Sequence, residues 1–380
     1  MSFANYKIPF NKPYFTGKEV KYIKDAVNKG HISGNGYYTK KCQAFFEEKY
    51  GFKKCLLTTS CTDALEMAAI LIDAKPGDEI IMPSFTFVST ANAFVLRGAT
   101  IRFVDSRTDH PGMDERKVEE LINPKTKAIV VVHYAGVACD MGLIMDLAKK
   151  YNLLIIEDAA KAIDSYYKSK PLGGIGHLGC FSFHETKNIS SGEGGMLVIN
   201  DDRFLERAEI IWEKGTNRSA FFKGEVDKYG WVDIGSSFLP SDIIAAILWA
   251  QLEKLDQIQQ KRIKIWRQYM AELQPINKRI GLPLIPDYAT NNGHMFYIIL
   301  ENTESKNNLI YNLKEKEILV VFHYISLHRS SYFTKKHDSR ELKQSDRYSE
   351  CLLRMPFYYE LDDAEIMTIC RVLRKTLDDK

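Results

Sequence analysis

The sequence has little excess charge of either sign, no long apolar run and no paired-cysteine motif. Its 52 basic and 49 acidic side chains give a formal net charge of +3, so composition offers no electrostatic basis for binding nucleic acid. The longest apolar runs, such as residues 128–132, are far shorter than a membrane span requires. Seven cysteines without a C-x-x-C pair favour neither a disulfide framework nor a zinc site. We therefore expect no nucleic-acid, membrane or metal partner.

Segments that mark other classes of protein are also missing. Residues 1–15 carry no basic stretch followed by an apolar one, so we expect no signal peptide and a cytoplasmic protein with reduced thiols. No Walker motif G-x-x-x-x-G-K-[ST] occurs, so a bound anion need not be a nucleoside triphosphate. Hydrophobic residues make up 45% and charged residues 27%, as in globular proteins, and 380 residues suit two α/β domains.

What is present first is a series of short, β-rich apolar runs. They span residues 54–58, 79–83, 100–105, 128–133, 153–158, 179–184 and 194–200. Several are continuous rather than alternating, which is typical of strands covered by helices on both faces. Stretches between the early runs, such as 62–73 and 141–151, have a helical pattern. This alternation predicts a mostly parallel seven-stranded sheet with crossover helices.

The pattern changes after about residue 240. We expect a long helix over 241–274, capped by Ser241, then strands at 294–300 and 318–322 and a last helix at 362–377. This order predicts a smaller C-terminal α+β domain, and we divide the chain into 1–250 and 251–380. Ligands of open α/β sheets bind at the carboxyl ends of the strands, so the chemistry is expected there.

Two strand ends carry polar residues that suit a ligand. Residues 59–65 (TSCTDAL) lie between a strand and a helix, where exposed backbone N–H groups and hydroxyls can hold an anion; an ordinary helix cap by Ser60 or Thr62 is the alternative. Asp158 ends a buried strand, where a carboxylate needs a partner such as a protonated pyridine nitrogen or a magnesium ion. Capping of a helix over the next residues, 159–167, is the alternative for Asp158.

A lysine follows another strand end. Lys187 lies in FSFHETKN, before the glycine turn 191–195 (SGEGG), where it can reach a bound aldehyde; alternatively it is a solvated surface charge. The segment 174–179 (GIGHLG) matches a dinucleotide-binding fingerprint by letter, but it neither follows an apolar strand nor opens a helix, so we interpret it as a glycine-rich turn. His323 and His328 have poor spacing for a metal.

Taken together, these pieces resemble the DegT family of sugar-nucleotide aminotransferases, within pyridoxal-phosphate (PLP) fold type I. The resemblance runs from Pro9 to the C-terminal helix, in family order and spacing. Its most specific segments are SCTDAL, PSFTFVSTANAF, VHYAGVACDM, IIEDAA, FSFHETKN, SGEGG and QLEKL.

The resemblance implies roles for individual residues. Lys187 would form the imine with PLP, and Asp158 would face the pyridine nitrogen and keep it protonated. The phosphate would be held by Cys61, Thr62 and Ser182. Phe87 would stack on the ring face. The family also implies a homodimer with shared active sites, in which Ser237 would reach the phosphate of the neighbouring subunit.

Three positions depart from the family pattern. Lys161 stands where Gln or His usually lies beside the phenolic oxygen of the cofactor; a cation there could donate to this oxygen and lower the imine pKa. Lys161 also places a second lysine near PLP. Residues 235–239 read GSSFL where most members have G-x-N-x-R, and Cys61 replaces the glycine of the usual S-G-T.

The function implied is ping-pong transamination, in which glutamate leaves as 2-oxoglutarate and a keto sugar takes the amine. Subgroup similarity favours dTDP-4-keto-6-deoxyglucose, aminated at C4, with the galacto product preferred over the gluco epimer and a 3-keto sugar as another alternative. His323 and Tyr324, with the basic pair Lys214 and Arg218, are the candidates for sugar contacts, although His323 and Tyr324 could merely pack between domains. Two rivals remain: a deoxysugar dehydratase, which would carry His in place of Lys187, and a non-catalytic regulator.

Overall fold

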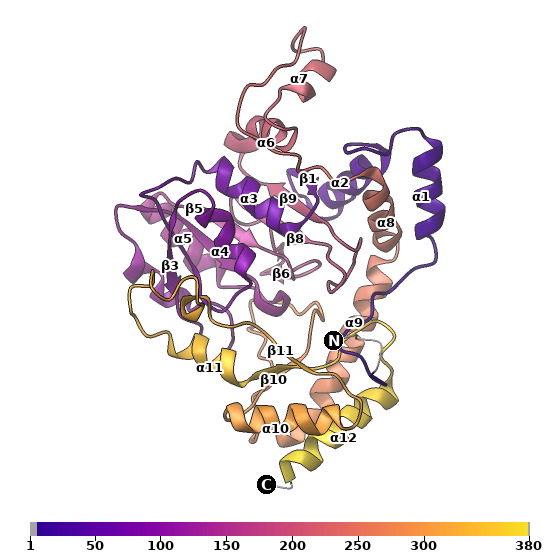
Figure 1. Cartoon of the computed structure of the whole chain (residues 1–380), viewed down its shortest axis with the longest axis vertical. Helices are drawn as coiled ribbons and strands as arrows, with labels where there is room; N and C mark the ends of the chain where they lie inside the picture. The colour runs from indigo at the N-terminus through magenta and orange to yellow at the C-terminus, as the bar shows by residue number, and fades with distance from the viewer. Residues whose placement is uncertain (1–5, 379–380) are drawn as a thin grey trace.

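The computed structural model describes residues 6–378, so the first five residues of the segment tested for a signal peptide lie outside it. Its centre is a seven-stranded sheet with the order β1-β9-β8-β5-β4-β2-β3 (Figure 1). The strand β9 runs antiparallel to β1 and β8 on its two sides, and all other pairs in the sheet are parallel. The strands are β1 (Lys54–Thr58), β2 (Glu79–Pro83), β3 (Thr100–Val104), β4 (Thr126–Val132), β5 (Leu154–Asp158), β8 (Leu178–Ser182) and β9 (Gly195–Ile199). All seven predicted strands are therefore confirmed, with ends shifted by at most two residues.

Helices cover both faces of this sheet, as the continuous apolar runs predict. Side chains along β4 alternate between two buried clusters, with Ile129 and Val131 in one and Ala128 and Val130 in the other. The first cluster is closed by α2 (Tyr37–Tyr50), α5 (Met141–Tyr151) and α8 (Asp242–Leu252). The second is closed by α3 (Cys61–Leu71), α4 (Val88–Val95) and α6 (Leu205–Trp212). A strand with two apolar faces can only be stable in such a covered position.

A second, antiparallel sheet lies toward the C-terminus, with the order β10-β12-β11 (Figure 1). Its strands are β10 (Tyr297–Ile299), β11 (Val321–Phe322) and β12 (Leu352–Arg354), and it packs with α9 (Leu255–Leu273), α10 (Thr303–Lys314) and α12 (Asp363–Asp378). The sequence predicts β10 and β11 but not β12, the central strand. The domain boundary at residue 250 stays a prediction. None of the helices within residues 6–378 combines the length and the apolar character that crossing a membrane requires.

The prediction of one helix over 241–274 was wrong. Ser241 does cap a helix, accepting a hydrogen bond from the Ile244 N–H, but α8 ends at Leu252 and α9 begins at Leu255. Glu253, at the break, is held toward α1 (Glu19–Asn28) by the Tyr22 hydroxyl at 2.6 Å. The break lets the start of α9 pack in the large core while its later turns pack in the small one.

The alternative helix over 159–167 does not form. These residues make turns that lead into the short hairpin of β6 (Tyr166–Tyr167) and β7 (Lys170–Pro171). The Asn292 side-chain amide donates to the Lys161 and Ile163 carbonyls, both at 2.8 Å, which withdraws these carbonyls from helical hydrogen bonds. Asp158 is therefore not the cap of a following helix.

Residues 174–177 of the glycine-rich segment form a turn, as predicted, whereas 178–179 begin β8, and the turn encloses a buried carboxylate. Glu157 accepts hydrogen bonds from the N–H groups of Gly173 at 2.8 Å, Ile175 at 2.7 Å and Gly176 at 2.5 Å. His133 Nε2 lies 2.9 Å from the same side chain. The glycines thus serve close backbone approach to Glu157 rather than to a dinucleotide.

Candidate active site

A cavity of about 430 Å³ lies at the carboxyl edge of the parallel strands. Its walls come from the ends of β5 and β8, the loops after β1, β2 and β4, and the C-terminal sheet. The predicted residues that line it are Cys61, Thr62, Phe87, Asp158, Lys161, Ser182, Lys187, His323 and Tyr324. This volume suits a cofactor or a small substrate.

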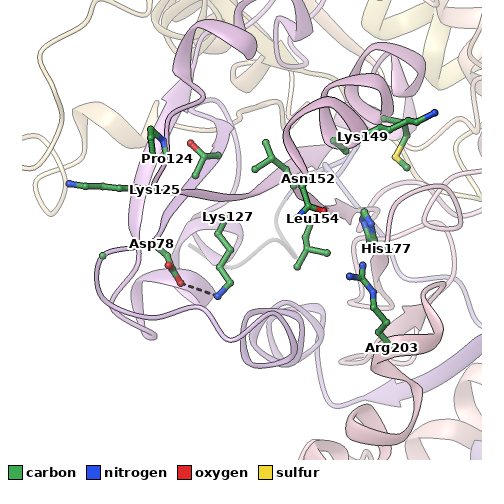
Figure 2. Close-up of a pocket in the computed structure, with 14 residues that line it drawn as sticks. Asp78, Pro124, Lys125, Lys127, Lys149, Asn152, Leu154, His177 and Arg203 are labelled. Atoms are coloured by element: carbon green, nitrogen blue, oxygen red, sulfur yellow. Dashed lines mark ion pairs between the residues drawn. The ribbon is translucent and has the colours of Figure 1, made fainter.

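A larger cavity, of about 740 Å³, lies at the opposite edge of the sheet, near the amino ends of β4 and β5 (Figure 2). Asp78 and Lys127 line it and form an ion pair with a separation of 3.2 Å, which a dashed line marks in Figure 2. Ligands of this sheet type bind at the carboxyl ends of strands, so the smaller cavity is the candidate active site.

Lys187 enters the cavity from the turn that follows β8. Its backbone N–H donates to the His184 carbonyl at 2.9 Å, which holds the backbone from which the side chain extends. Burial lowers the pKa of the Lys187 amine, although Cys61 and Asp158 act in the opposite direction. A lysine with a lowered pKa is more often neutral, and the neutral amine is the form that attacks an aldehyde.

Asp158, the last residue of β5, is 6% exposed and faces the same cavity. One carboxylate oxygen accepts a hydrogen bond from the Thr90 hydroxyl at 2.7 Å, and the other accepts from the Ala160 N–H at 3.2 Å. Both donors are neutral, so a bound cation can still be stabilised by the negative charge. A protonated ring nitrogen suits this position.

The amino end of α3 forms another wall of the cavity. Ser60 caps the helix by accepting from the Asp63 N–H at 3.1 Å, and Thr62 donates to the Ser89 hydroxyl at 2.8 Å. Backbone N–H groups at a helix start attract a phosphate. Gly195, which begins β9, permits the arrangement because a Cβ there would lie 2.3 Å from the Ser60 carbonyl carbon. The cap and the anion site are therefore compatible interpretations of this segment.

Phe87 lies immediately before α4 and lines the cavity with a 56% exposed side chain. An exposed aromatic face on a wall is suited to stacking on a flat ring. A buried amine, a buried carboxylate, a helix start and this aromatic face match the aldehyde, ring nitrogen, phosphate and ring of PLP. The described residues therefore fit this cofactor.

Lys161 belongs to a hydrogen-bonded chain that the sequence does not reveal. Its Nζ lies 3.4 Å from His323 Nε2, and His323 Nδ1 lies 2.6 Å from the Tyr134 hydroxyl. Burial, then the charge of Lys187, lowers the pKa of Lys161 well below its usual value, and burial also lowers the pKa of His323. Tyr134 can therefore donate to a neutral His323, whose other N–H can donate to a neutral Lys161 amine. This favours a neutral amine over the cation expected at position 161.

Lys214, Arg218 and Ser237 do not line the cavity of their own chain. They belong to residues 213–237, the projecting segment, whose helix α7 (Arg218–Phe222) stands at the top of Figure 1. Ser237 is exposed and pairs through a β-bridge with Glu213, and Arg218 lies 4.0 Å from the Glu213 carboxylate. Their predicted contacts stay predictions.

Thr90, His294 and Arg354 are among the lining side chains that the sequence analysis did not predict. Thr90 lies within the quoted segment PSFTFVSTANAF, but nothing in its spacing reveals that it bonds Asp158. His294 opens a predicted strand. Arg354 ends β12, and the short run of β12 gives little signal in the sequence.

Comparison with known proteins is consistent with this geometry. The sequence profile of the DegT/DnrJ/EryC1/StrS aminotransferase family matches residues 13–374. GDP-perosamine synthase from Escherichia coli O157:H7 is 30% identical over 377 residues, covering 98% of this chain and 99% of that protein. The spore coat polysaccharide biosynthesis protein SpsC from Bacillus subtilis (strain 168) is 28% identical over 379 residues, covering 97% of each. The solved structure of the aminotransferase TlmJ from Streptoalloteichus hindustanus gives a TM-score of 0.90 at 26% identity, covering 98% of this chain and 99% of that chain.

Proposed function

We propose that this chain, which belongs to the DegT/DnrJ/EryC1/StrS aminotransferase family, transfers the amino group of glutamate to C4 of dTDP-4-keto-6-deoxyglucose. The family consists of PLP-dependent sugar aminotransferases, so the chain is a transaminase that uses a sugar nucleotide and an amino donor. The proposed product is dTDP-4-amino-4,6-dideoxygalactose. The observation that carries the proposal is that Lys187 and Asp158 line one cavity at the carboxyl ends of the strands.

Different residues of the cavity would hold different parts of PLP. Lys187 would hold the cofactor covalently, and Asp158 would keep its ring nitrogen protonated. Cys61, Thr62 and Ser182 would bind the phosphate, and Phe87 would lie on the ring face. When bound, PLP supplies an aldehyde that exchanges amino groups and a ring that withdraws electrons from the neighbouring carbon.

Lys187 also supplies the base for the reaction. Its neutral amine can take a proton from the α-carbon of the donor and later deliver one to C4 of the sugar. Lys161 and His323 line the same cavity and can hold hydrogen bonds to a ligand oxygen, and Tyr134 is hydrogen-bonded to His323 behind them. Lys161 would offer an N–H to the phenolic oxygen of the cofactor, with His323 orienting its amine.

Sequence similarity supports the choice of sugar. The segments SCTDALEMAA, FVSTANAFVLRGA, HYAGVACDM, FHETKN, EKGTNRS and GSSFLPSD resemble the subgroup of the family that aminates this 4-keto sugar. His323 and Tyr324 line the cavity, where they would set which carbonyl faces Lys187. A GDP-linked keto sugar is the second candidate, because GDP-perosamine synthase is among the relatives.

Product analysis tests the proposal. We expect the purified protein to convert dTDP-4-keto-6-deoxyglucose in the presence of glutamate and PLP, and its yellow colour to bleach with glutamate alone. A proton NMR spectrum of the product should place the amine axially on C4. An equatorial amine would indicate the gluco epimer. An amine on C3, or faster turnover of a 3-keto isomer or a GDP-linked keto sugar, would contradict the proposed substrate.

We further propose that the active form is a homodimer with shared active sites. The projecting segment exposes Phe222 by 70% and Trp231 by 85%, which favours contact with another chain. Ser237 on this segment would reach the phosphate of the neighbouring subunit. Lys214 and Arg218 would contact the substrate of that subunit, because they lie away from the cavity of their own chain.

Mixing two inactive variants tests this arrangement. Lys187→Ala and Ser237→Asp should each be inactive alone, since the first lacks the amine and the second places a carboxylate against the phosphate. With free exchange of subunits, half of the dimers are mixed and each has one intact site, so about a quarter of native activity should return. Putting both substitutions on one chain and mixing it with Lys187→Ala is the control that should stay inactive. Absent complementation, or an active monomer, would contradict shared sites.

A further inference from the structure

Among residues 6–378, the guanidinium group of Arg354 has no hydrogen-bond or ion-pair partner. Arg354 ends β12, where its backbone pairs with Tyr297 of β10 and Val321 of β11, and its side chain lines the cavity. Its Nε atom is buried and makes no hydrogen bond, and no carboxylate within residues 6–378 forms an ion pair with it. Burial lowers the pKa of Arg354. The charged form of Arg354 therefore lacks its usual compensation from protein groups among residues 6–378.

Arg262 is a second buried arginine, and backbone carbonyls accept the hydrogen bonds of its guanidinium. Its Nε donates to the Gly293 carbonyl at 3.0 Å and its second nitrogen donates to the His294 carbonyl at 2.7 Å. Arg354, by contrast, has only a ring face, that of Phe10, whose centre lies 4.6 Å from the guanidinium carbon. The planar, five-donor group is therefore left available to the cavity.

The carboxylates that line the cavity do not compensate the charge of Arg354. They belong to Asp158 and Glu193. Asp158 is hydrogen-bonded by Thr90 and Ala160, and Glu193 has a 67% exposed side chain 3.7 Å from His184. Neither carboxylate pairs with Arg354, so an anion that neutralises Arg354 must come with a ligand.

We propose that Arg354 binds the α-carboxylate of the amino donor through a two-point hydrogen-bonded ion pair. This rests on the proposed function only in taking glutamate as the donor. The α-carboxylate lies two bonds from the reacting nitrogen, which must approach the site of Lys187, and both residues line one cavity. A sugar nucleotide carries its diphosphate across the ring from C4, far from the reacting carbon. Guanidinium and carboxylate match in shape, which gives the donor a fixed orientation.

The donor half-reaction isolates this contact from the sugar. Glutamate alone is added to the PLP form, and the absorbance of the cofactor is followed as a function of glutamate concentration. We expect Arg354→Gln to raise the half-saturating glutamate concentration at least about 30-fold, as for removal of one member of a buried charge pair. Arg354→Lys should lie between, and Arg347→Gln, an exposed arginine on α11 (Lys343–Cys351), should match the native protein.

A second donor identifies which carboxylate is bound. 4-Aminobutanoate has the amine and the far carboxylate of glutamate but no α-carboxylate. The native protein should prefer glutamate over it strongly, and this preference should fall at least about tenfold in Arg354→Gln, because the two changes remove the same interaction. An unchanged preference would overturn the assignment.

The reverse half-reaction and a binding assay complete the test. The half-saturating keto-sugar concentration for the pyridoxamine form should be the same in Arg354→Gln and the native protein; an equal rise there would assign Arg354 to the sugar instead. Glutarate, which cannot react, should raise the thermal midpoint of the native protein and not that of Arg354→Gln. If the native protein does not react with glutamate, the proposed donor is wrong. If the native protein reacts and Arg354→Gln has the same half-saturating glutamate concentration, only the inference about Arg354 is overturned. Arg354→Lys serves all these comparisons if the glutamine variant does not fold.

Discussion

Lys187→Ala is expected to lower turnover at least about 10⁴-fold while leaving the fold intact. The substitution removes both the proposed covalent attachment to PLP and the proposed base that moves the proton, and acid–base catalysis alone contributes about 10²–10⁴-fold. The side chain enters a cavity, so its truncation leaves the buried clusters on both faces of the sheet unchanged. Steady-state rates with glutamate and the keto sugar, together with circular dichroism, measure both expectations.

Lys161 provides the matched control, because it is a second lysine in the same cavity. The Lys161 amine lies 3.4 Å from His323 Nε2. The backbone of Lys161 belongs to a turn that is held by a hydrogen bond from Asn292, whereas Lys187 lies beside the glycine-rich turn 191–195. After borohydride reduction, peptide mapping should find the pyridoxyl label on Lys187 in the native protein and in Lys161→Gln. A label on Lys161, or substantial turnover by Lys187→Ala, would reverse the assignment.

The seven strands of the large sheet could be predicted because each is a dense apolar run with two buried faces. Consecutive residues of β4 belong alternately to two buried clusters, one containing Ile129 and Val131 and the other Ala128 and Val130. Because both faces are buried, consecutive residues are apolar, and the strand is a continuous apolar run in the sequence. The same reasoning places Asp158 and Lys187 at strand ends, where the structure brings them into one cavity. For these strands, the apolar pattern that predicts the strand also predicts where its site residue lies.

The missed features depend on contacts between distant residues. The turn at Lys161 is set by Asn292, which lies 131 residues away in the sequence. The strand β12 has only three residues and exists because β10 and β11 pair with it on both sides. The sequence alone therefore gives no sign that Arg354 lies against the cavity. The break between α8 and α9 likewise serves two separate cores that a single helical pattern cannot distinguish.

The polar surroundings of Asp158 lead to the second large effect. Thr90 and the Ala160 N–H hold the carboxylate in place without neutralising it, and the side chain is 6% exposed. A neutral amide of the same shape can keep both contacts, because the Thr90 hydroxyl can also accept a hydrogen bond. Asp158→Asn is thus a change of charge in a preserved geometry.

Asp158→Asn should keep the thermal midpoint near the native value and lower turnover at least about 100-fold, since electrostatic stabilisation of this kind is worth about 3 kcal/mol. The amide cannot stabilise a protonated ring nitrogen as the Asp158 carboxylate would, so electron withdrawal by a bound cofactor would be weaker. Asp164→Asn is the matched control: Asp164 lies outside the cavity at a positive φ of 57°, which asparagine also tolerates, and its rate should be native. A near-native rate for Asp158→Asn would mean that the carboxylate only orders the turn at Ala160, and the proposed contact with the ring would have to be abandoned.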